Sequence, residues 1–138
     1  MQTKQTRESA EAFWQFMASR NLDKAAEHIA ADYHYVGPGG VEARGVDGFT
    51  GMLDSYFSAF PDLSFTVHEI VCEQDKAVSR FTASGTHEGE LMGIAATGKS
   101  VSFAGTVIAR FERGKLVQEW ESLDELALMQ QLGVLPVA

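Results

Sequence analysis

In the segment Val101-Ser-Phe-Ala-Gly-Thr-Val-Ile-Ala-Arg-Phe111, apolar residues or glycine occupy every second position. Successive side chains of a strand point to opposite faces of a sheet, so a period of two indicates a strand with one buried face. The pattern therefore predicts a long strand over 101–111 that lies against a core.

The same alternation recurs on both sides of this strand. It predicts three further strands, over 63–72, 77–88 and 116–122. Arg113 and Gly114 form a tight turn between the last two strands, and a looser connection covers 89–98. Strands that follow one another along the chain in this way predict an antiparallel sheet.

The residues before the sheet show helical spacing instead. Apolar side chains recur there at intervals of three and four, as they do in a helix that buries one face. The predicted helices cover 7–19, 22–29 and 46–60, with a last short helix over 126–132. The segment Tyr33 to Val36 is β-prone and predicts a short strand. Helices followed by an antiparallel sheet define the α+β class.

Composition excludes several other classes of protein. The 138 residues have a formal net charge of −8 and are 45% hydrophobic, which suits one globular domain over residues 1–138. The negative charge disfavours nucleic acid and anionic membranes as partners. A single cysteine, Cys72, and no signal-peptide pattern suggest a cytoplasmic protein. No metal-ligand spacing, phosphate loop or dinucleotide fingerprint indicates a cofactor.

Several local strings carry a family resemblance. They are GTHEGELMGI at 85–94, TGK at 97–99, GKLVQEW at 114–120 and QLG at 131–133. With the order of elements, they resemble the SnoaL-like polyketide cyclases, in the superfamily of nuclear transport factor 2 and ketosteroid isomerase. The resemblance implies a cone-shaped α+β barrel, in which N-terminal helices pack on a strongly curved antiparallel sheet around a deep apolar pocket. It also implies a homodimer.

Cyclases of this family close a ring in an aromatic polyketide by intramolecular aldol condensation. They use an aspartate for proton transfer and neither a metal nor an organic cofactor. Asp124 matches that aspartate, and burial could raise the pKa of its carboxyl group toward neutrality. A structural interpretation stands beside this one. Ser122 and Glu125 have the spacing of a capping box, in which Asp124 only favours the start of a helix.

Two histidines are further catalytic candidates. His87 lies in the most specific string and could orient a carbonyl group or pass a proton; alternatively, it bonds to the backbone of a turn. His34 would face the pocket if Tyr33 and Tyr35 faced away from it. Otherwise it lies in the core or in solvent.

The candidate pocket residues are aromatic, flexible or charged. Aromatic side chains can stack on a flat ligand, although as a group they also form cores. Arg110 could bind an anionic group, or pair with Glu119 on the next strand and fix the register of the two strands. The candidates are Phe13, Trp14, Phe57, Phe60, Trp120, Met92 and Arg110.

These features predict a cofactor-independent enzyme that acts on a hydrophobic small molecule, with aromatic molecules among the candidates. The expected activity is that of a polyketide cyclase or a related isomerase or hydrolase, with Asp124 as general acid and base and His87 or His34 as an orienting donor. A second hypothesis is a non-catalytic domain that uses the same pocket or sheet face to bind an apolar ligand or a partner protein.

Overall fold

A computed structural model describes residues 2–136. Helix α1 (Gln2–Ser19) comes first and is followed by a 3-10 turn, η1 (Leu22–Lys24), and a one-turn helix, α2 (Ala25–His28). Strand β1 (Ile29–Val36), a second 3-10 turn, η2 (Pro38–Gly40), and strand β2 (Glu42–Arg44) lead into helix α3 (Gly45–Ala59). Four long strands follow, and a last helix closes the chain: β3 (Ser64–Glu73), β4 (Lys76–Thr86), β5 (Ser100–Glu112), β6 (Lys115–Leu123) and α4 (Glu125–Leu132).

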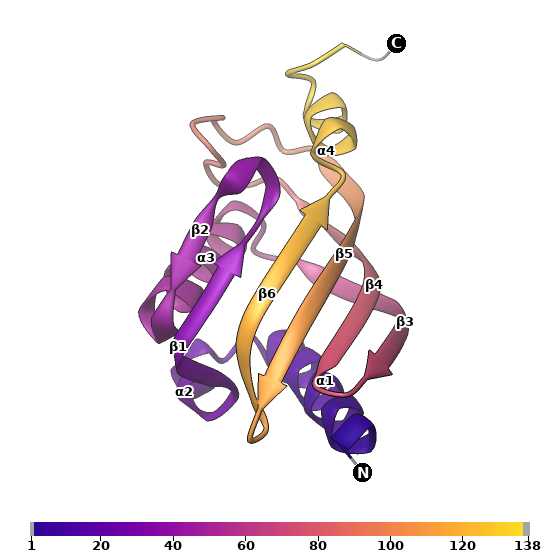
Figure 1. The fold of residues 1–138 in the computed structure, drawn as a ribbon. Helices are drawn as coiled ribbons and strands as arrows, with labels where there is room; N and C mark the ends of the chain where they lie inside the picture. Colours follow the sequence, from indigo (N-terminus) through magenta and orange to yellow (C-terminus); the bar gives the residue numbers. More distant parts are fainter. Residues whose placement is uncertain (1, 137–138) are drawn as a thin grey trace.

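The strands form one curved sheet in the order β2-β1-β6-β5-β4-β3 (Figure 1). Strand β1 pairs with β6 in parallel, whereas the other neighbours are antiparallel. The predicted α+β class is confirmed, and so are the four strands of the meander. The sheet is mixed rather than wholly antiparallel because α3 and the meander separate β1 from β6 in sequence.

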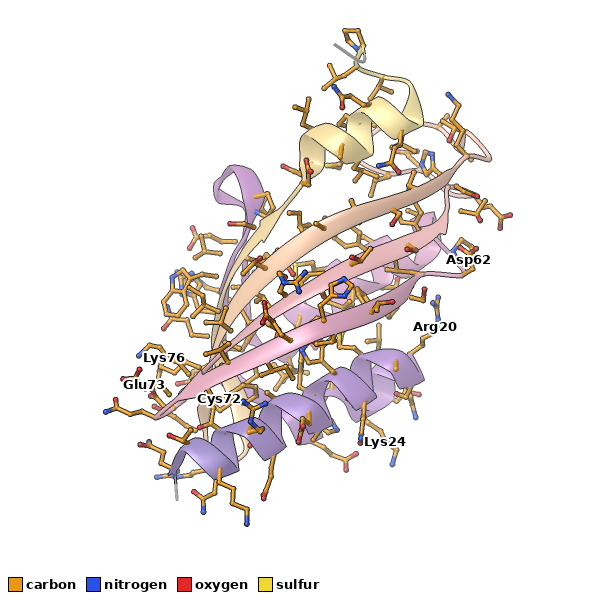
Figure 2. All side chains as sticks on the ribbon, turned by 90° about the vertical axis from the view of Figure 1, so that its right-hand side faces the viewer. Arg20, Lys24, Asp62, Cys72, Glu73 and Lys76 are labelled. Carbon is orange, nitrogen blue, oxygen red and sulfur yellow. The ribbon has the colours of Figure 1, made fainter. Side chains whose placement is uncertain are left out.

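Helices α1 and α3 cover the concave face of the sheet, with α4 at one end (Figure 1). Figure 2 shows α1 running along β3 from the end near Cys72 to the end near Asp62. Hydrogen bonds fasten both ends of this helix. The Thr6 hydroxyl donates to the carbonyl oxygen of Gln74, and the Arg20 guanidinium donates to that of Leu63 at 2.8 Å. None of the described helices has both the length and the apolar composition needed to cross a bilayer.

The predicted second helix over 22–29 is shorter in the structure. A 3-10 turn occupies 22–24 and a single α-helical turn 25–28, after which Ile29 already belongs to β1. The chain enters the sheet early because Ile29 is fully buried and pairs with Leu116 of β6. Strand β2, at the edge of the sheet, has no counterpart among the predicted elements.

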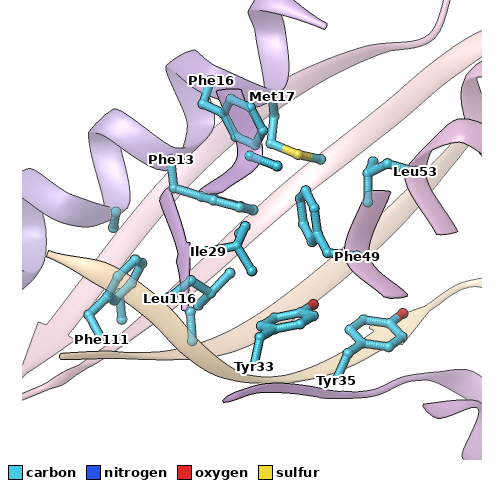
Figure 3. Close-up of a cluster of buried hydrophobic side chains, with 14 residues drawn as sticks. Phe13, Phe16, Met17, Ile29, Tyr33, Tyr35, Phe49, Leu53, Phe111 and Leu116 are labelled. Atoms are coloured by element: carbon cyan, nitrogen blue, oxygen red, sulfur yellow. The ribbon is translucent and has the colours of Figure 1, made fainter. Parts of the chain in front are cut away.

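The core consists of aromatic side chains held between the helices and the sheet. Phe49 of α3 lies at its centre, with ring centroids 6.1 Å from Phe13, 6.0 Å from Phe16 and 5.6 Å from Tyr33. Figure 3 shows Tyr33 and Tyr35 side by side beneath this cluster, with both hydroxyl groups directed to the same side. The two tyrosines of β1 therefore face inward.

Candidate active site

A cavity of about 60 Å³ lies between α1, α3 and the concave face of the sheet. Its walls are mostly aromatic and aliphatic. Phe13, Trp14, Met17, Phe49, Met52 and Leu53 line it from the helices, and Leu63, Phe65, Phe81, Ala83, Phe103, Val107 and Leu123 line it from the start of β3 and from the sheet. The polar groups on its wall are Tyr35, Tyr56, Glu119 and Glu121.

The two glutamates come from neighbouring inward positions of β6. Glu119 is only 5% exposed and Glu121 is half-buried. Two residues of a strand span about 6.6 Å, so the two carboxyl groups stand next to each other on one face of the sheet. Buried acidic side chains are rare unless they are paired or used. This pair is therefore the chemically distinctive feature of the cavity.

A bulge in β6 turns these glutamates inward. Phe111 pairs with Leu116, but Arg110 pairs with Gln118, so Val117 has no partner residue on β5. One extra residue in a strand moves every following side chain to the opposite face of the sheet. Leu116 and Val117 are consequently both buried, and Glu119, Glu121 and Leu123 face the cavity.

Each glutamate accepts a hydrogen bond from a tyrosine of β1. The Tyr33 hydroxyl donates to Oε1 of Glu119 at 2.5 Å, and the Tyr35 hydroxyl donates to Oε1 of Glu121 at 2.6 Å. The tyrosines can reach because β1 lies beside β6, with Tyr35 in register with Glu119. Tyr56 of α3 lines the same cavity.

The surroundings of both carboxyl groups favour their neutral forms. Burial, with the negative charge of Glu121 as a second cause, raises the pKa of Glu119 to about 8. Burial also raises the pKa of Glu121 to about 7, while the hydrogen bond from Tyr35 acts in the opposite direction. Burial and mutual repulsion thus favour retention of a proton by the pair at a pH at which exposed glutamates are ionised.

The same charges act on the phenols. Burial and the neighbouring glutamates raise the pKa of Tyr33 and of Tyr35 far above its usual range, and that of Tyr56 to about 12. The three tyrosines thus keep their protons. Tyr33 and Tyr35 use these protons in the hydrogen bonds to Glu119 and Glu121.

Asp124 lies outside the cavity. It is exposed and forms the N-cap of α4, where its Oδ1 accepts a hydrogen bond from the backbone N–H of Ala127 at 3.0 Å. This geometry agrees with the capping interpretation, with one change. Asp124 itself is the capping residue, whereas Ser122 still belongs to β6.

The two candidate histidines lie apart from the cavity as well. His87 is fully buried against Phe60, and its Nδ1 accepts a hydrogen bond from the backbone N–H of Thr97 at 3.2 Å. That contact matches the turn-bonding alternative. His34 points to the outer side of the sheet, because Tyr33 and Tyr35 take the inward positions, and its Nε2 lies 2.6 Å from Glu42 Oε1.

The structure divides the predicted pocket residues. Phe13 and Trp14 line the cavity. Phe60 is buried in a second core cluster, which includes Phe81 and Phe103. Phe57 packs against both this cluster and the one around Phe49, and the Arg20 guanidinium lies 4.3 Å from the centre of its ring. Met92 is exposed on a groove beside the cavity.

Two predicted pocket residues face away from the cavity on the outer side of the sheet. Trp120 is 36% exposed, because the bulge in β6 turns its side chain to the outer face of the sheet. Arg110 is paired with Glu112 at 2.7 Å and lies 3.9 Å from Asp75. The expected ion pair between Arg110 and Glu119 does not form, because the two side chains occupy opposite faces of the sheet.

The cavity lies inside an α+β cone and is apolar except for a few acidic and phenolic groups. Small-molecule sites have this composition. Several solved structures share this fold. TsrD from Streptomyces laurentii is 30% identical, with 98% of this chain and 99% of that chain covered and a TM-score of 0.85. IdmH from Streptomyces antibioticus, provisionally described as a polyketide cyclase, is 28% identical, with 93% and 98% covered and a TM-score of 0.81.

AclR from Streptomyces galilaeus, provisionally described as a hydroxylase, is 27% identical, with 99% of this chain and 85% of that chain covered and a TM-score of 0.85. The search of curated proteins gave no match. The family model of the SnoaL-like polyketide cyclases matches residues 4–132. The chain belongs to the SnoaL-like polyketide cyclase family, and the cone-shaped fold that the resemblance implied is confirmed.

Proposed function

We propose that the chain is an enzyme that moves protons on an apolar carbonyl compound, with Glu119 and Glu121 as its catalytic residues. The observation that carries the proposal is the pair of buried carboxyl groups on the cavity wall, each held by a tyrosine hydroxyl. Asp124 has the cap of α4 as its role instead.

The two carboxyl groups suit an aldol reaction because that reaction needs a base and then an acid. Glu121, the less buried carboxyl group of the two, takes a proton from the carbon next to a carbonyl group. The resulting enolate attacks a second carbonyl carbon, so a C–C bond forms and an alkoxide remains. Glu119, which keeps its proton at neutral pH, protonates that alkoxide. The substrate carbon has then lost one proton to Glu121, and the new hydroxyl group has gained one from Glu119. Transfer of a proton from Glu121 to Glu119, directly or through water, restores the starting state.

The walls of the cavity indicate the kind of substrate. Phe13, Trp14, Phe81 and Phe103 offer faces and edges to an aromatic or polyketide-like molecule. The cavity is narrow, and Met17 and Met52 are the wall residues best able to change shape, since methionine is unbranched and flexible. We expect these two side chains to move when a ring enters.

Proton exchange on a simple ketone tests this proposal. With 2-acetylnaphthalene in D₂O, the protein should accelerate loss of the methyl signal in proton NMR. The Glu121→Gln variant should slow this reaction by about 10²- to 10⁴-fold, whereas Asp124→Asn and the surface control Glu112→Gln should stay near wild type.

Three outcomes would overturn the proposal. A wild-type rate in Glu121→Gln removes Glu121 as the base. Loss of proton exchange in a folded Asp124→Asn variant would make Asp124 the catalytic base. Binding of the ketone without any exchange would favour a non-catalytic binding domain.

A homodimer through the outer face of the sheet completes the proposal. Trp120 and Ile108 are register partners there and are 36% and 39% exposed, so a second copy could cover them. Light scattering should give twice the 15.1 kDa of one chain. The Ile108→Asp variant should give a monomer, while Leu126→Asp, at an exposed position of α4, should not change the mass. A wild-type monomer would contradict the dimer.

A further inference from the structure

A groove of about 690 Å³ lies beside the cavity. Tyr35, Met52 and Tyr56 line both hollows, so the groove borders the cavity along these three side chains. The other groove residues come from η2 and the residue after it, from α3, from the loop before β5 and from the start of α4. Those that bear on binding are Val41, Asp54, Glu90, Met92 and Glu125.

Two apolar side chains of this groove are open to solvent. Val41 is 58% exposed and Met92 is 57% exposed, and they come from segments about 50 residues apart in the chain. A ligand in the groove would take both side chains out of water, which is favourable in proportion to the apolar area covered. The cavity holds only about 60 Å³, so an extended substrate exceeds it, and the groove that borders it offers room for the remainder.

The charges around the groove have one sign. Asp54, Glu90 and Glu125 line it, and no lysine or arginine does so among residues 2–136. None of these three carboxylates takes part in an ion pair within the described part of the chain. The net charge of −8 and the glutamate pair behind the groove add to the same negative potential.

We propose that the groove binds the part of the substrate that projects from the cavity, and that it selects apolar molecules with an uncharged or cationic end over anionic ones. This inference rests on the proposed function, because it concerns the outer part of the same site. Carboxylic acids and phosphorylated carriers would meet repulsion at the entrance. An apolar amine or a neutral polyketone would not.

Tryptophan fluorescence gives a direct readout of binding. The sequence contains two tryptophans, Trp14 on the cavity wall and Trp120 on the outer face. In a Trp120→Phe background, Trp14 is therefore the only reporter. The probes share one ring system: 1-naphthylmethylamine is cationic, 1-naphthalenemethanol is neutral and 1-naphthoate is anionic at pH 7.

Two triple variants with the same change in net charge separate the groove from the rest of the surface. Asp54→Asn, Glu90→Gln and Glu125→Gln neutralise the groove. The matched control, Asp23→Asn, Glu8→Gln and Glu11→Gln, neutralises exposed residues of α1 and the turn after it. Both sets of substitutions change the net charge from −8 to −5, since each removes three negative charges.

At low salt, the amine should bind about tenfold more tightly than the naphthoate in the Trp120→Phe parent. The groove variant should reduce this ratio about threefold or more, and the control should leave it within about a factor of 1.5. Equal binding of the three probes, or an equal effect of both triple variants, overturns the inference but leaves the proposed chemistry standing. If no probe quenches Trp14, the cavity takes no aromatic ligand, and both proposals fail.

Discussion

Tyr35 and Glu121 lie 86 residues apart in the chain, yet the tyrosine hydroxyl donates a 2.6 Å hydrogen bond to the glutamate carboxylate. The parallel pairing of β1 with β6 brings them together. Tyr35 also lines both the cavity and the groove beside it. This hydrogen bond therefore connects the proposed base to the wall along which a substrate would enter.

Removal of this hydrogen bond should change the pH dependence of proton exchange. The Tyr35 hydroxyl lowers the pKa of Glu121, against the larger effect of burial. In Tyr35→Phe the pKa of Glu121 should rise, and the rise in rate with pH should move to higher pH. A pH profile of 2-acetylnaphthalene exchange measures this shift. A profile that keeps its wild-type midpoint would separate Tyr35 from the titration of Glu121.

The buried Glu119 should make the protein less stable in mildly alkaline solution. The pKa of Glu119 is about 8 in the folded protein and 4.5 as the reference value, so the folded state holds a proton that the unfolded state releases between these values. The free energy of unfolding should then fall as pH rises from about 5 to 8.

Urea unfolding at several pH values measures this effect. Glu119→Gln cannot titrate and should show a smaller loss across the same range, while the surface variant Glu112→Gln should follow wild type. A Glu119→Gln variant with the full wild-type decline would assign the pH dependence to other groups.

Gly37 is expected to be necessary for the position of Tyr35. A Cβ atom at Gly37 would lie 2.3 Å from the Tyr35 hydroxyl oxygen and 2.5 Å from its Cε1. The Gly37→Ala variant should therefore lose roughly 1–3 kcal/mol of stability from overpacking, and proton exchange should fall with it. Gly51→Ala is the control, because a Cβ there meets no atom within 4 Å and Gly51 lies in α3. It should stabilise the protein by about 0.5–1 kcal/mol. Equal stabilities of the two variants would contradict the crowding at Gly37.

Asp124 should contribute to stability rather than to chemistry. Its carboxylate caps α4 through the Ala127 N–H. Asp124→Ala should cost about 1 kcal/mol, and Asp124→Asn only a few tenths, because asparagine caps as well as aspartate does. Thermal unfolding of both variants tests this expectation. A large loss of stability in Asp124→Asn would show that the negative charge itself is required.

The fold was predictable to a large extent because its periods are long and regular. Residues 101–111 alternate without interruption, and β5 covers 100–112. Helix α3 and the predicted 46–60 segment agree closely for the same reason, since the apolar residues Phe49 and Leu53 of its stripe do pack inward. The parallel pairing of β1 with β6 is a long-range contact that local periodicity does not record.

The site was harder to predict because one unpaired residue determines it. Simple alternation from the buried Leu116 would send Trp120 inward and Glu119 outward, which also agrees with ordinary hydrophobicity. The bulge at Val117 reverses this phase, and no glycine marks it. The adjacent apolar residues Leu116 and Val117, both buried, are the one local sign of it. Tyr33 and Tyr35 alternate with His34 and indicate a shared face, but not which face is inside.

Glu119 and Glu121 are expected to hold about one proton between them near neutral pH. Carbon-13 NMR of protein labelled at the glutamate carboxyl carbons, titrated from pH 3 to pH 10, measures this, with Glu119→Gln and Glu121→Gln to assign the signals. Two carboxyl signals should titrate near neutrality, with apparent pKa values of about 7 and about 8. If every glutamate signal titrates below pH 5, the pair is fully ionised at neutral pH, and the proposed acid is absent.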